Sequence, residues 1–205
     1  GPGTWTLSGS NQYSGATAVA KGTLRLGSLE AIPQDSETSI DAGATLDLND
    51  QSSSIDSITL NGGDGSGKAA AIMASTALIK DGALTGTITS KGGLLSGVSV
   101  ADLNVSGGRT FIRDMKAGTS LGDVEVSGGQ LWAADDDQAT VAKLTLETKS
   151  FTPVDPRNED RSLGAVQDGL VLGFDDDESA ALKVTDKFTY SSGNVYLYKP
   201  AGEAE

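Results

Sequence analysis

A Val-Ser-Gly-Gly string begins at Val105 and again at Val126, and this repetition restricts the fold more than any other feature of the sequence. The surrounding segments are also alike, since LNVSGGRTFI at 103–112 corresponds to VEVSGGQLWA at 124–133. A unit of about 20 residues made of short strands and Gly-rich turns is typical of one solenoid coil, which hydrogen-bonds to the coils on either side. The repeat therefore predicts stacked coils with the Gly-Gly steps at their corners.

Short triplets with an apolar, a variable and again an apolar residue recur along the chain. One side of such a triplet can point into a core while the middle residue faces water, as in half-buried strands. No segment shows the apolar spacing of a helix over three turns, so we expect almost no helix. The triplets are Leu24–Leu26, Leu46–Leu48, Ile58–Leu60, Leu103–Val105, Val124–Val126, Leu144–Leu146, Leu182–Val184 and Val195–Leu197.

The repeat length separates the all-β architectures that use many short strands. Propeller blades need about 40 residues each, and a sandwich has no reason to return the same turn string one coil later. We therefore predict an all-β, right-handed, single-stranded parallel β-helix with a C-terminal β cap, of roughly eight or nine coils. A sandwich or an irregular β-roll is the alternative. Glycine is abundant, with 27 residues in 205, but a flexible Gly/Ser linker would not need the recurring apolar triplets.

The charge and the missing residue types restrict the function. With 15 Lys and Arg against 28 Asp and Glu the net charge is -13, which disfavours nucleic acid and anionic lipid as partners. The chain has no cysteine and no histidine, so it lacks thiol nucleophiles, disulfides and the usual proton-transfer side chain. We therefore expect that the chain is not an enzyme and that it has no catalytic residues, no cofactor and no metal site.

The chain is expected to divide into four parts. Residues 1–2, Gly-Pro, resemble the remnant of a cleaved fusion tag, and 3–149 form the β-helix coils. Residues 150–169 contain Pro153 and Pro156 and are expected to form an inserted loop, and 170–205 contain terminal coils and the cap. The loop is a candidate for ligand contact, although a mobile connection explains it equally well; the contact residues would be Arg157, Asn158, Glu159, Asp160 and Arg161. No apolar run approaches the roughly 20 residues of a membrane-spanning helix, and no signal peptide opens the chain.

Two stretches resemble the repeats of bacterial autotransporter passengers. GTWTLSGSNQYSGATAVAKGTLRLG at 3–27 is similar to the autotransporter-associated β-strand repeat, through Thr6-Leu7-Ser8-Gly9, Asn11, Tyr13, Gly15, Thr17, Val19 and Gly22-Thr23-Leu24. SIDAGATLDLNDQSSSIDSITLNGG at 39–63 resembles the coil that usually follows, with Asp50 where the pattern often has Gly. The resemblance implies a type V secretion passenger, reached through the periplasm and located at the surface of a Gram-negative bacterium or released from it.

The end of the chain, LKVTDKFTYSSGNVYLYK at 182–199, resembles the last coils of pertactin-like passengers. In that family this region caps the β-helix next to the translocation barrel and promotes folding and secretion, a role called autochaperone. Large side chains suit such a cap because they can cover the open end of a core. The candidate cap residues are Phe188, Tyr190, Val195, Tyr196, Leu197 and Tyr198.

Several other features admit a binding function. The acidic clusters 135–137 and 175–178 and the GGDGSG string at 62–67 could bind calcium, but solvated turns explain them better because none has EF-hand spacing. Trp5 and Trp132 could stack on sugars, but burial is expected, with either Leu131 or Trp132 facing the core. Asn49, Asn61, Asn104 and Asn194 are expected in corner hydrogen bonds and ladders.

We therefore predict a membrane-proximal structural stalk that supports adhesion or aggregation. Its partners would be a host-surface protein or glycan, or further copies of itself, together with its own outer-membrane barrel. The alternative is a carbohydrate-active or calcium-dependent glycan-binding module.

Overall fold

The computed structural model describes residues 3–62, 76–115, 118–133, 139–148, 169–173 and 182–198. These residues form strands joined by turns and bends, and none of them forms a helix, as predicted. Accordingly, no helix in this part of the chain is long and apolar enough to cross a membrane. The strands are β1 Thr4–Leu7, β2 Thr17–Val19, β3 Gly22–Leu26, β4 Thr38–Asp41, β5 Ala44–Ser53, β6 Ser57–Asn61, β7 Leu78–Ser90, β8 Gly93–Arg113, β9 Leu121–Ala133, β10 Ala139–Glu147, β11 Gly169–Gly173, β12 Leu182–Ser192 and β13 Asn194–Tyr198.

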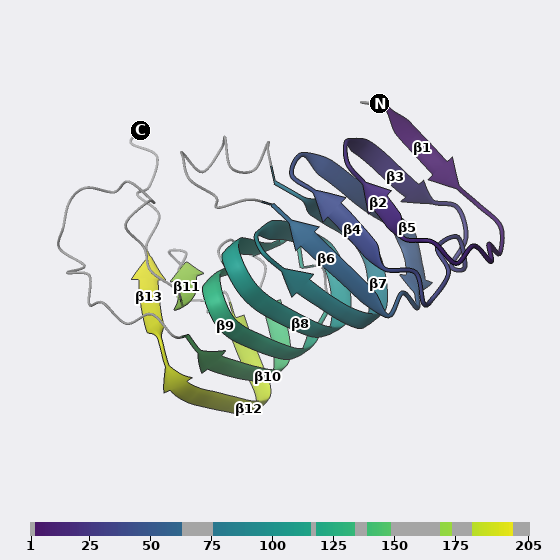
Figure 1. Cartoon of the computed structure of the whole chain (residues 1–205). Helices are drawn as coiled ribbons and strands as arrows, with labels where there is room; N and C mark the ends of the chain where they lie inside the picture. Colours follow the sequence, from purple (N-terminus) through teal and green to yellow (C-terminus); the bar gives the residue numbers. More distant parts are fainter. Residues whose placement is uncertain are drawn as a thin grey trace, which may run out of the picture.

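The strands wind as a coil from β1 at one end of the molecule to β13 at the other (Figure 1). Every strand pairing among the described residues is parallel, and each strand pairs with strands of the coils before and after it. This parallel stacking excludes the sandwich alternative and agrees with the predicted β-helix solenoid. The right-handed sense of the coil stays a prediction.

The coil has three faces. Face 1 begins with β1, β3 and the start of β5, and face 2 begins with β2, β4 and β6. Face 3 begins only at the end of β5, which pairs with the middle of β7. β8 runs through all three faces and returns to the first, so that Leu94 at its start packs against Phe111 near its end. Long strands of this kind result from bends that keep the backbone paired at the corners.

Inward-facing residues form apolar columns along the coil axis. On face 2, Ile88, Leu103, Val124 and Leu144 lie over one another in successive coils, and all four are buried. Nearly all the buried apolar residues belong to one continuous cluster that runs from Val19 to Leu170. Full burial of each large aliphatic side chain stabilises the fold by about 1.5–3 kcal/mol, so the columns hold the coils together.

The two Val-Ser-Gly-Gly strings lie in adjacent coils, as the repeat predicts. Val105 of β8 pairs with Val126 of β9, and Val124 pairs in turn with Leu144 of β10. Gly108 and Gly129, the second glycines of the two strings, have φ values of 61° and 69°. A left-handed conformation of this kind turns the chain and favours glycine, so the Gly-Gly steps are corners.

A second corner, between faces 1 and 3, explains the departure of Asp50 from the repeat pattern. Asn49 and Asp50 both take left-handed conformations, with φ values of 56° and 57°, and Asp81 follows in the next coil at 55°. Asn and Asp tolerate this conformation better than other non-glycine residues. The backbone N–H of Asn49 also donates to Asp47 Oδ1 over 2.9 Å, so the side chain that closes this corner belongs to Asp47.

Neither tryptophan is buried as predicted, whereas the predicted alternation of residues 131 and 132 is correct. Leu131 is fully buried in the core while Trp132 faces outward, where it is partly covered, as the alternation predicts. Trp5, in contrast, is 72% exposed. It pairs with Leu24 and occupies an inward-facing position, but β1 is an edge strand of the described sheet, so no further described layer covers its ring.

Candidate functional site

The last coil places the candidate cap residues at the ends of the inward-facing columns. Phe188 of β12 lies over Leu144 of β10, and Tyr190 lies over Leu146. On face 1, Val195 of β13 lies over Leu170 of β11, which itself lies over Leu131. Three separate columns therefore end in residues that the sequence assigns to the cap.

The exposure of these residues follows from their terminal position. Phe188, Tyr190 and Val195 are 50%, 56% and 46% exposed, whereas Leu144, Leu146 and Leu170 beneath them are buried. Among the described residues each has a neighbouring layer on one side only, so part of its apolar surface is left uncovered by them. The backbone of β13 continues face 1 in register, pairing Tyr196, Leu197 and Tyr198 with residues 171–173.

The turn between β12 and β13 is fixed by one hydrogen bond within the turn and one to the coil below. The Tyr190 hydroxyl donates to the Gly193 carbonyl over 3.0 Å, and Ser192 Oγ donates to the Thr148 carbonyl over 2.8 Å. Gly193 has a φ of 121°, and a Cβ at this position would lie 2.6 Å from Thr148 Oγ1. The final bend therefore requires glycine, and it holds Tyr190 over the end of its column.

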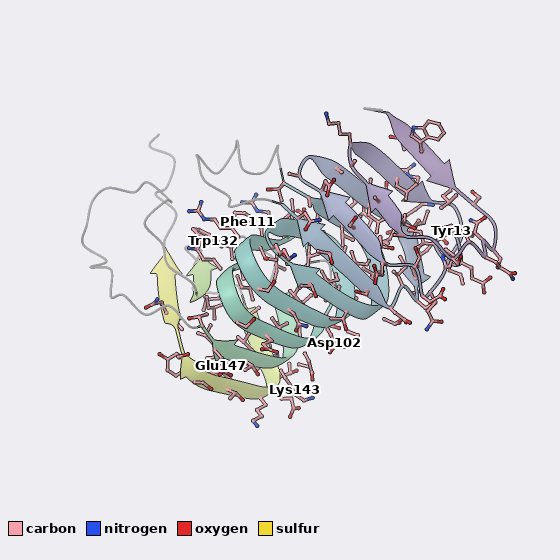
Figure 2. The ribbon with its side chains drawn as sticks, viewed as in Figure 1. Tyr13, Asp102, Phe111, Trp132, Lys143 and Glu147 are labelled. Carbon is pink, nitrogen blue, oxygen red and sulfur yellow. The ribbon has the colours of Figure 1, made fainter. Side chains whose placement is uncertain are left out.

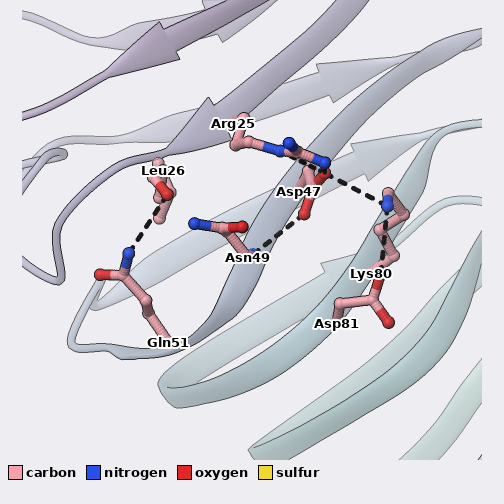
Figure 3. A network of polar contacts seen from close by, with 7 residues as sticks. All are labelled: Arg25, Leu26, Asp47, Asn49, Gln51, Lys80 and Asp81. Carbon is pink, nitrogen blue, oxygen red and sulfur yellow. Dashed lines mark hydrogen bonds and ion pairs between the residues drawn. The ribbon is translucent and has the colours of Figure 1, made fainter.

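A charged network crosses three coils on the outer side of face 1 (Figure 3). Asp47 is 2% exposed. It accepts a hydrogen bond from Arg25 Nε over 3.0 Å and forms an ion pair with Lys80 over 3.2 Å. Lys80 also contacts Asp81 over 3.1 Å. Because Arg25, Asp47 and Lys80 belong to three successive coils, the network fixes the lateral order of β3, β5 and β7.

The network shifts two pKa values. Burial acts to raise the pKa of Asp47, but the hydrogen bonds from Arg25, Lys80 and the Asn49 N–H and the charge of Lys80 outweigh it, and the pKa is lowered. The hydrogen bond to Asp81 raises the pKa of Lys80, assisted by Asp47 and opposed by burial. Asp47 is therefore ionised throughout the neutral range, and the network is a structural clamp.

A polar surface on face 2 shows stacked charges of the kind that could hold a cation. Asp102 lies directly under Asp123, and Asp123 contacts Lys143 of the next coil over 2.9 Å. This contact raises the pKa of Lys143. No group of three or more acidic side chains in the described ranges is placed to hold a metal ion. Lys143 offsets the charge of Asp123, and Figure 2 shows Asp102 and Lys143 on the outer surface of the coil.

Phe111 and Trp132 form an apolar column on the outer side of face 1 (Figure 2). Their ring centroids are 5.7 Å apart, and Leu78 and Leu94 pack in the same outer cluster. Trp132 Nε1 donates to Gln130 Oε1 over 2.8 Å, and Arg109 Nε donates to the same oxygen over 3.2 Å. The alternation of Leu131 and Trp132 predicts that one of the two faces outward, but the sequence does not show which one, nor that the indole stacks on Phe111.

Several predicted sites lie outside the described residues. These include the candidate contact loop with Arg157, Asn158, Glu159, Asp160 and Arg161, the acidic clusters 135–137 and 175–178, and all of 62–67 except Gly62. The remnant at 1–2 also lies outside them, and the four predicted divisions of the chain stay predictions.

Sequence reasoning missed one recess near the beginning of the coil. It lies between the turn 10–14 and the segment 30–35, and it has a volume of about 550 Å³. Tyr13, which Figure 2 shows at this end of the molecule, is one of its lining residues. The signal was available in the spacing, because the residues between β1 and β2 and between β3 and β4 are more numerous than a tight corner needs.

Comparison with known proteins finds a family match for the first coil. Residues 1–26 match the model of the passenger-associated-transport-repeat, which supports an autotransporter passenger repeat in this segment. Over 111 residues, or 53% of this chain, the sequence is 35% identical to an uncharacterized lipoprotein, YdeK, of Escherichia coli (strain K12). The chain spans 7% of the length of that relative. No solved structure matches the chain.

Proposed function

We propose that this chain is a membrane-proximal part of an autotransporter passenger. It acts as a rigid stalk for adhesion or aggregation at the bacterial surface, and its C-terminal end promotes folding and secretion. One observation carries the proposal: a passenger repeat opens a chain whose coils stack in register around a continuous apolar core. Rods built in this way resist bending because every coil is hydrogen-bonded to its neighbours.

The coil is proposed to be right-handed. A connection between parallel strands of one sheet is right-handed in about 98% of cases, because the twist of the strands favours that sense. Every described pairing is parallel, so the same preference acts at each turn of the solenoid.

The folding role rests on the terminal columns. Phe188, Tyr190 and Val195 each extend a buried column, so an ordered last coil offers a paired edge and an apolar surface to the coil beneath it. Parallel pairing between coils is slow to nucleate because its contacts are distant in sequence. A stable terminal coil supplies the nucleus, and folding then propagates along the rod without ATP.

Truncation tests this folding role. Deletion of residues 182–199 is expected to lower the melting temperature markedly and to slow refolding from urea. Deletion of residues 3–20, a segment of similar length at the other end, is the matched control and is expected to affect refolding less. A chain without 182–199 that melts cooperatively at the original temperature and refolds at the original rate would refute the cap.

The surface location is supported by the passenger repeat and by the description of the relative as a lipoprotein. The proposed partners are a host-surface protein or glycan, or other copies of the chain, and in the whole protein a C-terminal outer-membrane barrel. Nucleic acid is not among them because of the net charge of -13. A structural rather than catalytic role is supported by the absence of cysteine and histidine. Surface labelling of intact cells that express the whole gene tests the location.

A further inference from the structure

The recess beside Tyr13 occupies the place that strands of face 3 take in later coils. Between β1 and β2, and again between β3 and β4, the chain makes longer connections in place of a face 3 strand. Their side chains surround the recess of about 550 Å³, and Asn11, Tyr13, Glu30, Ile32, Gln34 and Asp35 are among the residues that line it. Ligand sites typically enclose about 300–1,000 Å³, so this volume suits a small ligand.

Hydrogen bonds between coils hold the walls of the recess in place. Asn11 Nδ2 donates to the Ala31 carbonyl over 2.8 Å and to the Ser8 carbonyl over 3.3 Å. On the other wall, the Asp56 N–H donates to the Gln34 carbonyl over 2.8 Å, and Gln34 Nε2 donates to Asp56 Oδ1 over 2.9 Å. A ligand therefore meets a formed site and does not have to order these connections.

A chain of hydroxyl groups fixes the direction of the Tyr13 hydrogen bond. Ser36 Oγ donates its only proton to the Gly15 carbonyl over 3.1 Å, so in its 2.9 Å contact with Thr17 Oγ1 it must accept. Thr17 then donates to Ser36, and in its 2.6 Å contact with the Tyr13 hydroxyl it must accept in turn. Tyr13 thus donates its hydroxyl proton to Thr17, and its oxygen can only accept a further hydrogen bond.

Several other groups of the recess are also hydrogen-bond acceptors. Both amide protons of Asn11 are used, which leaves Asn11 Oδ1 as an acceptor, and the carboxylates of Glu30 and Asp35 accept only. The lining contains no lysine or arginine. Tyr13 and Pro33 supply most of the apolar part of the lining, because Ile32 is only 2% exposed. The remaining polar residues of the lining, Ser10, Gln12, Ser14, Gln34 and Ser54, can also donate. The recess therefore repels anions and suits a ligand that both donates and accepts hydrogen bonds and has an apolar face.

We propose that this recess binds a neutral saccharide. Sugar hydroxyls supply the donors that Tyr13, Asn11, Glu30 and Asp35 require, and the C–H face of a pyranose ring packs against tyrosine and proline. A polyamine also offers donors, but it accepts no hydrogen bonds when protonated and lacks a flat apolar face to pack against Tyr13 and Pro33. The proposal assigns a site to the saccharide-binding alternative raised by the sequence, and it does not depend on the folding role of the C-terminal coil.

The test is titration of the isotope-labelled chain with oligosaccharides of glucose, galactose, mannose and N-acetylglucosamine, followed by NMR. An oligo-uronate and spermidine are titrated in parallel. We expect at least one neutral oligosaccharide to shift the amide signals of residues 10–14 and 30–35 and to bind more tightly than either charged probe. Tyr13→Ala is expected to weaken that binding at least tenfold, while Trp5→Ala, which alters an exposed aromatic residue outside the recess lining, leaves it unchanged.

Asp35→Asn guards against a loss of binding that merely reflects unfolding. Asp35 is exposed, so this variant is expected to keep the melting temperature and still lose affinity several-fold. Three results would overturn the proposal: no neutral oligosaccharide shifts these signals, an oligo-uronate or spermidine binds more tightly than all of them, or both Tyr13→Ala and Asp35→Asn bind as the original chain does.

Discussion

Substitution of the corner glycines by alanine separates two physical costs that the solenoid imposes on its turns. Gly129 has a φ of 69°, and a Cβ placed on it would lie 2.4 Å from the Gly108 carbonyl oxygen of the preceding coil. Gly43 has a similar φ of 76°, but a Cβ there would meet nothing within 4 Å. Gly107 belongs to the same corner as Gly108 and has open space and no left-handed conformation.

The expected costs follow from these geometries. Gly43→Ala should destabilise the fold by about 1–2 kcal/mol, the cost of a left-handed residue with a side chain. Gly129→Ala should cost about 2–5 kcal/mol, because a clash with backbone atoms of the preceding coil adds about 1–3 kcal/mol to the same strain. Gly107→Ala should be neutral, or stabilising by up to about 1 kcal/mol, because it reduces the freedom of the unfolded chain.

Urea unfolding followed by far-UV circular dichroism measures the three midpoints. The expected order of stability is Gly107→Ala above Gly43→Ala above Gly129→Ala. Equal losses at Gly43 and Gly129 would show that the coils are not in close contact at the Val-Ser-Gly-Gly corner. A neutral Gly129→Ala would refute both the left-handed corner and the stacking of the two strings.

Three further results are expected. Phe188→Ala should cost about 1 kcal/mol because half of its side chain is exposed, whereas Leu144→Ala in the layer below should cost about 2–5 kcal/mol, measured by urea unfolding. Asp47→Asn should cost about 1–3 kcal/mol at neutral pH. Since the pKa of Asp47 is lowered on folding, its contribution is present above the unfolded value of about 3.9 and is lost as the pH falls through the folded pKa, so melts of Asp47→Asn and of the original chain should converge in acid. Asp123→Asn, which removes an exposed ion pair, should change the melting temperature little, and less still in high salt.

The repeat in the sequence was sufficient to predict the stacking of the coils. Apolar residues at alternate positions must face the same way in a strand, and equal strings one coil apart must meet if the coils stack. Leu103, Val124 and Leu144 therefore form one column as predicted, and the glycines at the ends of the strings form corners because left-handed conformations favour glycine.

Whether residues at the ends of the columns are buried depends on neighbouring layers, which the periodicity of the sequence does not reveal. Trp5 has the alternation of a core residue, yet 72% of it is exposed because β1 pairs on one side only among the strands that the structure describes. The same reason leaves Phe188 and Tyr190 half exposed although they continue buried columns.

The sequence by itself determined the period, the strand positions and the corners, because these depend on local conformation and on alternation along the chain. The tertiary structure decided which distant side chains meet. Asp47 lies between Arg25 and Lys80, and the Tyr13 recess forms where two connections from successive coils come together, only because the stacking sets their distances.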